Sequence, residues 1–403
     1  MPNPRTGPPA QLFFSTPEQR AALARERFFE EGDQPTGLVN DAVLQSWSRC
    51  NAAGKRTGDR ITAEPVSSLR LDAALRHSRL LRAAASPGLS RLETALAGTA
   101  SQILLTNAQG MIICIGQRSP CAAESALPAL ARLGMDLSES TLGTTAPGIV
   151  SATGKGCSVL ANEHFNEAIL GVQCAAAPIH DVEGRLAGVL DLSVEGRGFG
   201  FDAYTLIASY ARDIENRLLQ LQSDDMLVLA FHADAGLLGT PLEALAGIDG
   251  QGTVRWTNGT GARLTGAERG LPALDVLGCP LHALVALARH PGPHALRLPN
   301  GLAVWCSARL QAPDGAAALT PAPFAPPAQV LPPAALPEQD STAQPATPLT
   351  LEQAQAESIA RALESAGGKV ARAARALGVS RGVIYRHLQR NQGVPAPSSG
   401  TPT

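Results

Sequence analysis

The segment Cys174–Ser193, CAAAPIHDVEGRLAGVLDLS, decides the fold of the first half of the chain. Its apolar runs CAAAPI and LAGVLDLS flank the polar turn Asp181–Gly184, an arrangement typical of a β-hairpin whose glycine takes a positive φ. A second hairpin is predicted upstream, where ILLT and MIICI flank Asn107–Gly110. Consecutive strands of this kind indicate a mainly antiparallel sheet.

Helical sequence surrounds these strands. Helices are predicted over residues 16–32, 40–54 and 65–84, and we expect this front segment to pack against the next domain, because apolar helical stripes usually mark a core. A further amphipathic helix is predicted over residues 201–223, with one apolar stripe formed by Leu206, Ile207, Tyr210, Ile214 and Leu218. Strands flanked by helices make this half of the chain an α+β domain.

After residue 223 the sequence contains two stretches of different composition, residues 224–310 and residues 311–348. Residues 224–310 show a strand, a Gly-rich turn and a second strand in LAGIDGQGTVRWTN, then a late hairpin around Pro299–Gly301. This stretch has a faint resemblance to a PAS domain, and a plain packing unit between domains is the alternative. Residues 311–348 are rich in Pro and Ala, so we expect a disordered linker that cannot bury enough apolar surface to fold.

Residues 349–392 form a compact predicted module, and residues 393–403 a disordered tail. Thr350 and Gln353 suit a capping box, and the first helix ends at Gly367-Gly368. The helices KVARAARAL and RGVIYRHLQRN follow, joined by LGVS with Gly378 in the tight turn, which is helix-turn-helix spacing. From Leu351 to Arg390, seven Lys and Arg residues face three Glu, a balance of +4. This one-sided charge favours binding of double-stranded DNA.

The module resembles the Fis-type helix-turn-helix through AlaArgAlaAla at 371–374, LGVSRG at 377–382, and Ile384, Tyr385, Arg386 and Leu388. The resemblance implies dimerisation through the first helix. Arg381 and Arg386 can reach guanine edges or phosphates, and Gly382 lets the backbone approach the groove. The predicted DNA-binding residues are Ser380, Arg381, Gly382, Val383, Arg386, Arg390 and Arg372.

The first half of the chain resembles the acetoin-catabolism activator family of sigma-54-dependent bacterial regulators. The residues that carry this resemblance are Ser46–Cys50, Gly143-Thr144, Gly148, Glu163–Phe165, Cys174–Ile179, Gly184–Leu186 and Gly188–Ser193. It implies a GAF-like domain at 86–223 that senses a small molecule, behind an N-terminal helical segment at 1–85. We take Thr144, His164 and Cys174 as candidate ligand-binding residues. The family's usual ATPase domain is absent here, since no G-x-x-x-x-G-K-[ST] motif occurs.

The composition of the chain excludes several classes of protein and of binding site. The chain has 403 residues, 17% of them charged, with a net charge of -2, so a uniformly basic nucleic-acid coat is excluded. Its seven cysteines include no CxxC pair, which argues against a disulfide framework and a structural zinc site. No catalytic residue, metal or cofactor is predicted. Without a signal peptide or an apolar run long enough to span a membrane, we expect a cytoplasmic protein with no membrane partner.

We therefore predict a multidomain α+β transcription regulator that senses an unknown effector and binds an inverted-repeat site as a homodimer, without ATP-driven activation of sigma-54 polymerase. It would act by occluding a promoter, by recruiting RNA polymerase, or by modulating a full-length relative. Two alternatives stay open. One is a co-regulator that contacts a partner activator, and the other is a GAF-fold enzyme whose C-terminal module only oligomerises. Redox sensing by Cys174 is a further hypothesis.

Overall fold

The computed structural model describes residues 16–61, 64–116, 126–196, 198–290 and 292–311, together with residue 370. The chain divides into two compact units, residues 1–325 and 326–403, and all described residues except Val370 lie in the first. The predicted linker and the predicted helix-turn-helix module, apart from Gln311 and Val370, lie outside the described residues.

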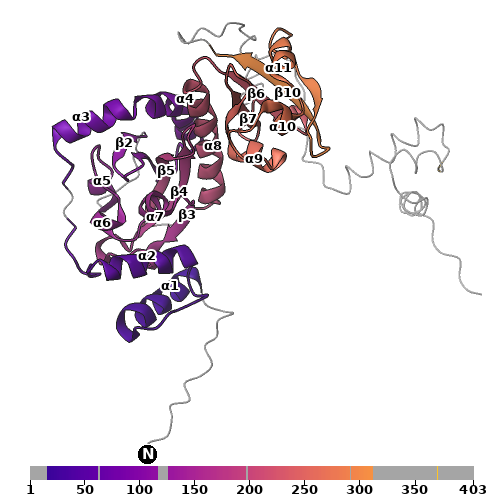
Figure 1. Ribbon diagram of the computed structural model, residues 1–403. Helices are drawn as coiled ribbons and strands as arrows, with labels where there is room; N and C mark the ends of the chain where they lie inside the picture. The colour runs from indigo at the N-terminus through magenta and orange to yellow at the C-terminus, as the bar shows by residue number, and fades with distance from the viewer. Residues whose placement is uncertain are drawn as a thin grey trace, which may run out of the picture. The chain divides into compact units, whose positions relative to one another are not determined.

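A five-stranded antiparallel sheet forms the centre of the first half of the chain (Figure 1), in the order β2-β1-β5-β4-β3. Both predicted hairpins are present, and Gly110 and Gly184 take φ values of 86° and 73° in their turns. This confirms the predicted α+β architecture with a mainly antiparallel sheet. The strands are β1 (Gln102–Asn107), β2 (Ile112–Ile115), β3 (Cys157–Leu160), β4 (Val172–His180) and β5 (Leu186–Glu195).

Both faces of this sheet are covered. One face packs on α4 (Arg79–Ala95) and α8 (Ala203–Leu221), which lie side by side, and this layer buries Leu190 and Leu192 of β5. Val189 of the same strand belongs to the core on the opposite face. Because side chains alternate along a strand, Asp191 and Ser193 share the face of Val189. Because both faces of the central strands are buried, their sequences are nearly continuous runs of apolar residues.

The opposite face is covered by short elements and by the front of the chain. Residues of the two front helices, such as Ala24 and Trp47, belong to the same core cluster as Leu104 of β1. The front helices thus pack on the sensor domain, as predicted. The elements on this side are α1 (Pro17–Glu26), the π-helical turn η1 (Arg27–Glu31), α2 (Asp41–Ala52), α5 (Ala126–Leu130), α6 (Glu139–Leu142), α7 (Ala146–Thr153) and the 3-10 turns η2 (Ala161–Glu163) and η3 (Glu167–Ile169).

One predicted boundary falls inside a helix. The front segment was expected to end at residue 85, but α4 continues to Ala95 after the short helix α3 (Ser68–His77). Pro87 lies within α4, and Leu89 and Leu92 beyond it are buried in the core shared with α8. This packing keeps the second half of α4 on the sheet despite the hydrogen bond that the proline removes.

Residues 227–311 form a second five-stranded antiparallel sheet, in the order β8-β7-β6-β10-β9, with a core of its own (Figure 1). Asn258 caps α9 by accepting a hydrogen bond from the Gly261 amide at 2.8 Å. The elements are β6 (Leu227–His232), the 3-10 turn η4 (Ala235–Leu237), β7 (Ala244–Ile248), β8 (Val254–Thr257), α9 (Gly259–Thr265), α10 (Ala273–Leu277), α11 (Leu281–Leu287), β9 (His294–Arg297) and β10 (Ala303–Leu310).

The C-terminal end of α8 belongs to both halves of this unit. Leu219 of α8 packs in one buried cluster with Trp256 of β8. The Trp256 indole donates to Ser223 Oγ at 3.1 Å, and the Asn258 amide donates to Asn216 Oδ1 at 2.8 Å. One helix therefore contacts the sensor sheet along its length and the second sheet at its end.

Gly188 offers a test of how tightly the first sheet is packed. A β carbon at this position would lie 2.4 Å from the carbonyl oxygen of Thr106 and 2.6 Å from Leu81 Cδ2. Because a backbone atom cannot yield cheaply, we predict that Gly188→Ala lowers the free energy of unfolding by about 1–3 kcal/mol, measured by denaturant titration. Gly200→Ala is the control, since nothing lies within 4 Å of its β carbon. Equal stability of the two variants would contradict the packing.

Candidate functional site

A small cavity lies on the face of the first sheet that the front helices cover. Its volume is about 30 Å³, room for roughly two water molecules. Most of its wall is apolar and comes from the strands and from short helices and loops on that face. The lining residues are Leu104, Leu127, Leu130, Leu137, Leu142, Thr145, Pro147, His164, Ile169, Val172, Cys174, Asp191 and Ser193.

The polar side of the cavity is set by strand register. Cys174 of β4 pairs with Ser193 of β5, and Asp191 pairs with Ala176. Ser193 Oγ therefore lies between two partners, 2.6 Å from Asp191 Oδ2 and 3.3 Å from Cys174 Sγ. The hydroxyl has one proton, and the shorter contact to the carboxylate is the stronger hydrogen bond.

His164 reaches the same site from the loop after η2. Its Nδ1 lies 3.0 Å from the carbonyl oxygen of Ala161, and its Nε2 lies 3.5 Å from Cys174 Sγ. A carbonyl oxygen only accepts, so Nδ1 carries the proton and Nε2 is left as an acceptor for the thiol. Two of the sequence candidates, His164 and Cys174, are thus in contact although ten residues separate them.

Burial controls the charge of these groups. It lowers the pKa of His164 to about 4, raises the pKa of Asp191 to about 7, and raises the pKa of the Cys174 thiol well above its usual range. Cys174 and His164 therefore meet as a neutral thiol and a neutral imidazole. A nucleophilic or redox-sensing cysteine needs thiolate character, so this arrangement speaks against both roles.

The third sequence candidate, Thr144, lies elsewhere. Its hydroxyl is 2.8 Å from Ser46 Oγ and 3.9 Å from Cys50 Sγ, both on α2. The neighbouring Thr145 lines the cavity and caps α7 by accepting from the Gly148 amide. The extended backbone at this N-cap sends adjacent side chains in opposite directions, so a one-residue difference separates the cavity from the helix contact.

Residues of the front motif Ser46–Cys50 are hydrogen-bonded to two segments that line the cavity, helix α6 and the loop that carries His164. Arg49 donates to both carboxylate oxygens of Glu139, at 2.7 and 2.6 Å, and Ser46 also donates to Glu139 at 2.6 Å. A paired Arg–carboxylate contact of this kind fixes orientation as well as position. It holds the start of α6, whose Leu142 is a cavity residue.

The loop that carries His164 is held from the same side. Trp47 Nε1 donates to the Glu163 carbonyl at 2.8 Å, and Arg25 donates to the carbonyls of His164 and Phe165 at 2.5 and 2.8 Å. The Phe29 ring packs against both Trp47 and Phe165. The motif at 46–50 thus contacts both Thr144, outside the cavity, and the 163–165 loop, which supplies His164 to the cavity wall.

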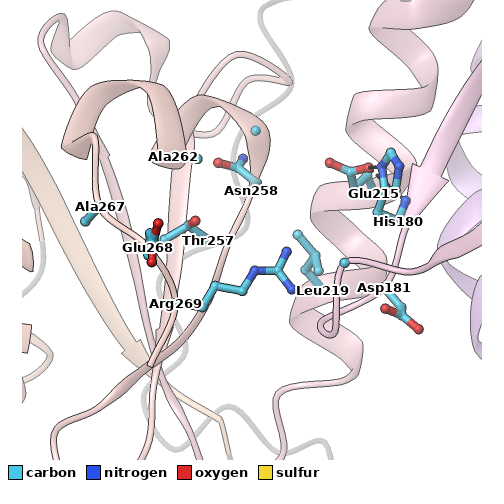
Figure 2. A pocket seen from close by; sticks show the side chains of 12 residues that line it. His180, Asp181, Glu215, Leu219, Thr257, Asn258, Ala262, Ala267, Glu268 and Arg269 are labelled. Atoms are coloured by element: carbon cyan, nitrogen blue, oxygen red, sulfur yellow. Dashed lines mark hydrogen bonds and ion pairs between the residues drawn. The ribbon is translucent and has the colours of Figure 1, made fainter. Parts of the chain in front are cut away.

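A larger cavity of about 630 Å³ lies between α8, the β4–β5 turn and the region of α9 (Figure 2). His180 and Glu215 form an ion pair at 3.0 Å across its wall, and this hydrogen bond raises the pKa of His180. Arg269 extends toward the turn and reaches the Val182 carbonyl at 3.4 Å. Acidic and basic groups alternate around this cavity, so its chemistry singles out no class of ligand.

Sequence reasoning missed Asp191 and Ser193 as site residues. The signal was available, because an aspartate interrupts the apolar run VLDLS of a strand that is buried on both faces. A buried acid without an evident partner is a candidate for function.

Several predicted features lie outside the described residues. The proposed DNA-contacting residues Arg372, Ser380, Arg381, Gly382, Val383, Arg386 and Arg390 all belong to this group. In the described ranges, no cluster of His, Cys, Asp or Glu suits a metal ion, and the six described cysteines are unbridged. None of the described helices is long and apolar enough to cross a membrane.

Comparison with protein families gives two matches. The model for the MimR N-terminal domain matches residues 16–216, and the model for the Fis family of bacterial regulatory proteins matches residues 350–390. The first covers the front helices, the sensor sheet and most of α8. The second covers the predicted helix-turn-helix module.

Curated relatives agree with these matches. The propane 2-monooxygenase operon transcriptional activator MimR of Mycolicibacterium smegmatis is 28% identical over 211 residues, 51% of this chain and 34% of the relative. The acetoin catabolism regulatory protein of Cupriavidus necator is 30% identical over 258 residues, 60% of this chain and 37% of the relative. The aligned part thus spans little more than a third of each relative.

Solved structures give lower similarity. The Escherichia coli DhaR(N)–DhaL complex matches with 16% identity and a TM-score of 0.42, covering 67% of this chain and 99% of that one. Pseudomonas aeruginosa HmgR matches with 15% identity and a TM-score of 0.27, covering 50% of this chain and 96% of that one.

The two shifted pKa values predict opposite effects of pH on stability. Asp191 holds its proton up to about pH 7 in the folded chain but ionises near 3.8 when unfolded, so its contribution to stability falls as pH rises between these values. His164 stays neutral down to about pH 4 when folded but titrates near 6.5 when unfolded, so its contribution rises with pH over that window. In the native protein the two slopes oppose each other.

Replacing either residue should reveal the pH dependence that the other contributes to the free energy of unfolding. Between pH 4.5 and 6, as a test window of about 1.5 units, Asp191→Asn should make unfolding free energy rise with pH, relative to the native chain, by about 1 kcal/mol per unit. His164→Gln should make it fall by a similar amount, and the double variant should regain the native slope. Denaturant titrations at each pH measure this. Slopes that do not move in opposite directions would show that one of the two groups is not held as described.

Proposed function

We propose how two parts of this chain work together, starting from the match of residues 16–216 to the MimR N-terminal domain model and of residues 350–390 to the model of the Fis family of bacterial regulatory proteins. The chain is a transcriptional regulator with a sensor domain and a Fis-type helix-turn-helix. In the proposal, a small-molecule effector occupies the cavity beside His164 and Cys174, and the C-terminal module reads DNA.

The single observation that carries the sensor role is that the front motif at 46–50 is hydrogen-bonded to two segments that supply residues to the cavity wall. Arg49 holds helix α6, which contributes Leu142 to the wall, and Trp47 holds the loop that contributes His164. A displacement of these segments on ligand entry would be transmitted to α2 through these hydrogen bonds. At the opposite face, α8 extends from the sensor sheet to Ser223 and the second sheet. In the proposal, α8 transmits the change, because it both continues the chain from the first sheet and packs against the second sheet.

The DNA-reading role rests on residues 350–390. Their match to the Fis family and the excess of Arg residues after Glu364 support major-groove binding by the third predicted helix. We propose that Ser380, Arg381, Val383 and Arg386 contact DNA, that Gly382 allows close approach, and that Arg372 and Arg390 add phosphate contacts. Dimerisation through the first helix of the module would present two copies to an inverted repeat.

We further propose that the chain regulates without driving sigma-54 polymerase by ATP hydrolysis. Between the sensor and the module the sequence has no phosphate-binding G-x-x-x-x-G-K-[ST] motif. The protein would then act in the cytoplasm by occluding a promoter, recruiting RNA polymerase or modulating a relative that carries the ATPase. Action as a co-regulator, through protein contact alone, is the second candidate, and DNA binding separates the two.

The first test is DNA binding by the full chain. Binding-site selection supplies the probe, and affinity is then measured at a fixed salt concentration, because phosphate contacts make it salt-dependent. Arg381→Ala combined with Arg386→Ala should weaken specific binding at least roughly thirtyfold, since each base contact contributes about 1–3 kcal/mol. Arg255→Ala with Arg289→Ala removes the same charge from two exposed positions, one on β8 and one in the turn after α11. Equal loss in both pairs would contradict specific reading by the module.

The second test is ATP hydrolysis. Purified full chain with its selected DNA should show no DNA-stimulated ATPase activity above the buffer control. A clear DNA-dependent rate would overturn the proposed mode of regulation, while leaving the DNA-reading module in place.

A further inference from the structure

A cavity of about 280 Å³ lies where the end of α8 meets the second sheet. Strand pairing decides which side chains of the sheet line it. Val228 of β6 pairs with Arg309 of β10, and Ala230 of β6 pairs with both Ser307 of β10 and Leu245 of β7. Side chains of directly paired residues share one face of a sheet, so these five belong to the same wall. This wall is therefore apolar except for a hydroxyl and a guanidinium group.

Two residues of opposite charge in this cavity have no ion-pair partner among the residues that the structure describes. One is Glu243, which is 8% exposed and accepts a hydrogen bond from the Gly239 amide at 2.6 Å. The other is Arg309, which is exposed on β10. Burial raises the pKa of Glu243, and the Gly239 hydrogen bond and the positive charge of Arg309 oppose that rise. The two side chains thus interact across the cavity without forming an ion pair.

The other two charged residues that line the cavity, Asp213 and Arg217, are paired. Arg217 Nε lies 3.3 Å from Asp213 Oδ2, and Arg91 donates to the same oxygen at 2.5 Å. Asp213 therefore has two cations beside it, and Arg217 has its anion on the same helix. A carboxylate that is buried without a cation loses hydration that nothing replaces, so the unpaired state of Glu243 is costly. The charges available to a ligand are the carboxylate of Glu243 and the guanidinium of Arg309.

A buried amide group adds a hydrogen-bond donor. Asn258 Oδ1 accepts from the backbone amides of Leu245 and Gly261, at 3.0 and 2.8 Å, so the NH₂ group of Asn258 faces the opposite way. That NH₂ group donates to Asn216 Oδ1 at 2.8 Å. The NH₂ group of Asn216 therefore points away from Asn258, and it is buried without an acceptor among the described residues. Asn216 lines this cavity and an adjoining one of about 270 Å³, and a carboxylate in the first cavity would supply the missing acceptor.

We propose that this cavity binds a small zwitterion of the amino-acid class, whose ammonium group pairs with Glu243 and whose carboxylate pairs with Arg309 and the Asn216 amide. The guanidinium of Arg309 can hold a carboxylate by two parallel hydrogen bonds, and the ammonium group gives the buried Glu243 the cation that it lacks. Val228 and Leu245 supply apolar contacts for the ligand's side chain. The inference names a second ligand site and goes beyond the proposed function, because it needs neither the cavity beside the cysteine nor the DNA-reading module.

Ligands with a single charge fit the same groups less well. A carboxylate alone would lie near the unpaired negative charge of Glu243, and an amine alone would lie near the positive charge of Arg309. The cavity beside His164, of about 30 Å³, is too small for an amino acid, so the two sites are separable. Because Asn216 belongs to α8 and Arg309 to the second sheet, a bound zwitterion would also join the helix to the sheet.

The test compares L-leucine with two analogues that each lack one charge. Isocaproate lacks the ammonium group, and isoamylamine lacks the carboxylate. Binding to the full chain is measured by ligand-observed saturation-transfer NMR at about pH 7.5, well above the ordinary pKa range of carboxyl groups. The native protein should bind L-leucine at least roughly tenfold more tightly than either analogue, since hydrogen bonds between charged groups are the stronger ones. Bound L-leucine should also raise the unfolding temperature of the native chain.

Two variants test the two charges separately. Glu243→Gln keeps an acceptor for the Gly239 amide but removes the negative charge, so the preference for L-leucine over isocaproate should disappear while the preference over isoamylamine remains. Arg309→Gln removes the positive charge, so the preference over isoamylamine should disappear while the preference over isocaproate remains. Glu31→Gln and Arg255→Gln are the matched controls, because they remove the same charges at exposed positions outside the cavity and should leave both preferences unchanged.

The crossed pattern of lost preferences supports the site. No binding of L-leucine to the native chain up to about 10 mM, an analogue that binds as tightly as L-leucine, or variants that keep both preferences would overturn it. Thermal unfolding without ligand shows whether each variant is folded, and Arg309→Gln, at an exposed position, keeps the test decisive if Glu243→Gln is unstable. Affinity for the selected DNA is measured in parallel, so failure of the DNA-reading proposal is seen separately.

Discussion

The alternation of side chains along the central strand β5 is the constraint on which the sensor depends. Leu190 and Leu192 enter the core beneath α4 and α8, so Asp191 and Ser193 must face the other way. A register shift of one residue would carry the carboxylate into an apolar helix-covered face. Close packing at Gly188, two residues before Leu190, opposes such a shift. The polar side of the cavity is thus a direct consequence of how the sheet is paired.

The front helices α1 and α2 are hydrogen-bonded to the wall of this cavity. Arg25 and Trp47 donate to main-chain carbonyls of the loop that carries His164, and Arg49 binds Glu139 of α6, which also lines the cavity. These contacts replace the hydrogen bonds that exposed loops would otherwise make with water, so the cavity wall and the front of the chain are mechanically joined. On the far side of the sheet, α8 carries the connection onward to the buried pair Asn216 and Asn258.

Local chemistry explains what could be predicted from sequence. Thr16 and Gln19 form the capping box that begins α1, Gly32 ends the turn after it, and both hairpin turns occur at the predicted glycines. The cavity was harder to foresee, because Asp191 and His164 meet only through strand pairing and a loop held by Trp47. Thr144 was chosen instead of Thr145 because sequence alone does not show which way each side chain of an extended N-cap points. The predicted DNA contacts depend on residues outside the described ranges.

Asp191 lies buried in the core of the first sheet, and its Oδ1 has no hydrogen-bond donor among the described residues. Isotope-edited infrared titration of the carboxyl group, assigned by difference from Asp191→Asn, tests this most directly. Ionisation is expected with a pKa of about 7, because burial outweighs the single hydrogen bond from Ser193. Ionisation near the ordinary value of 3.8 would show that the carboxylate is solvated or already paired, and would rule out an unpaired buried oxygen on Asp191.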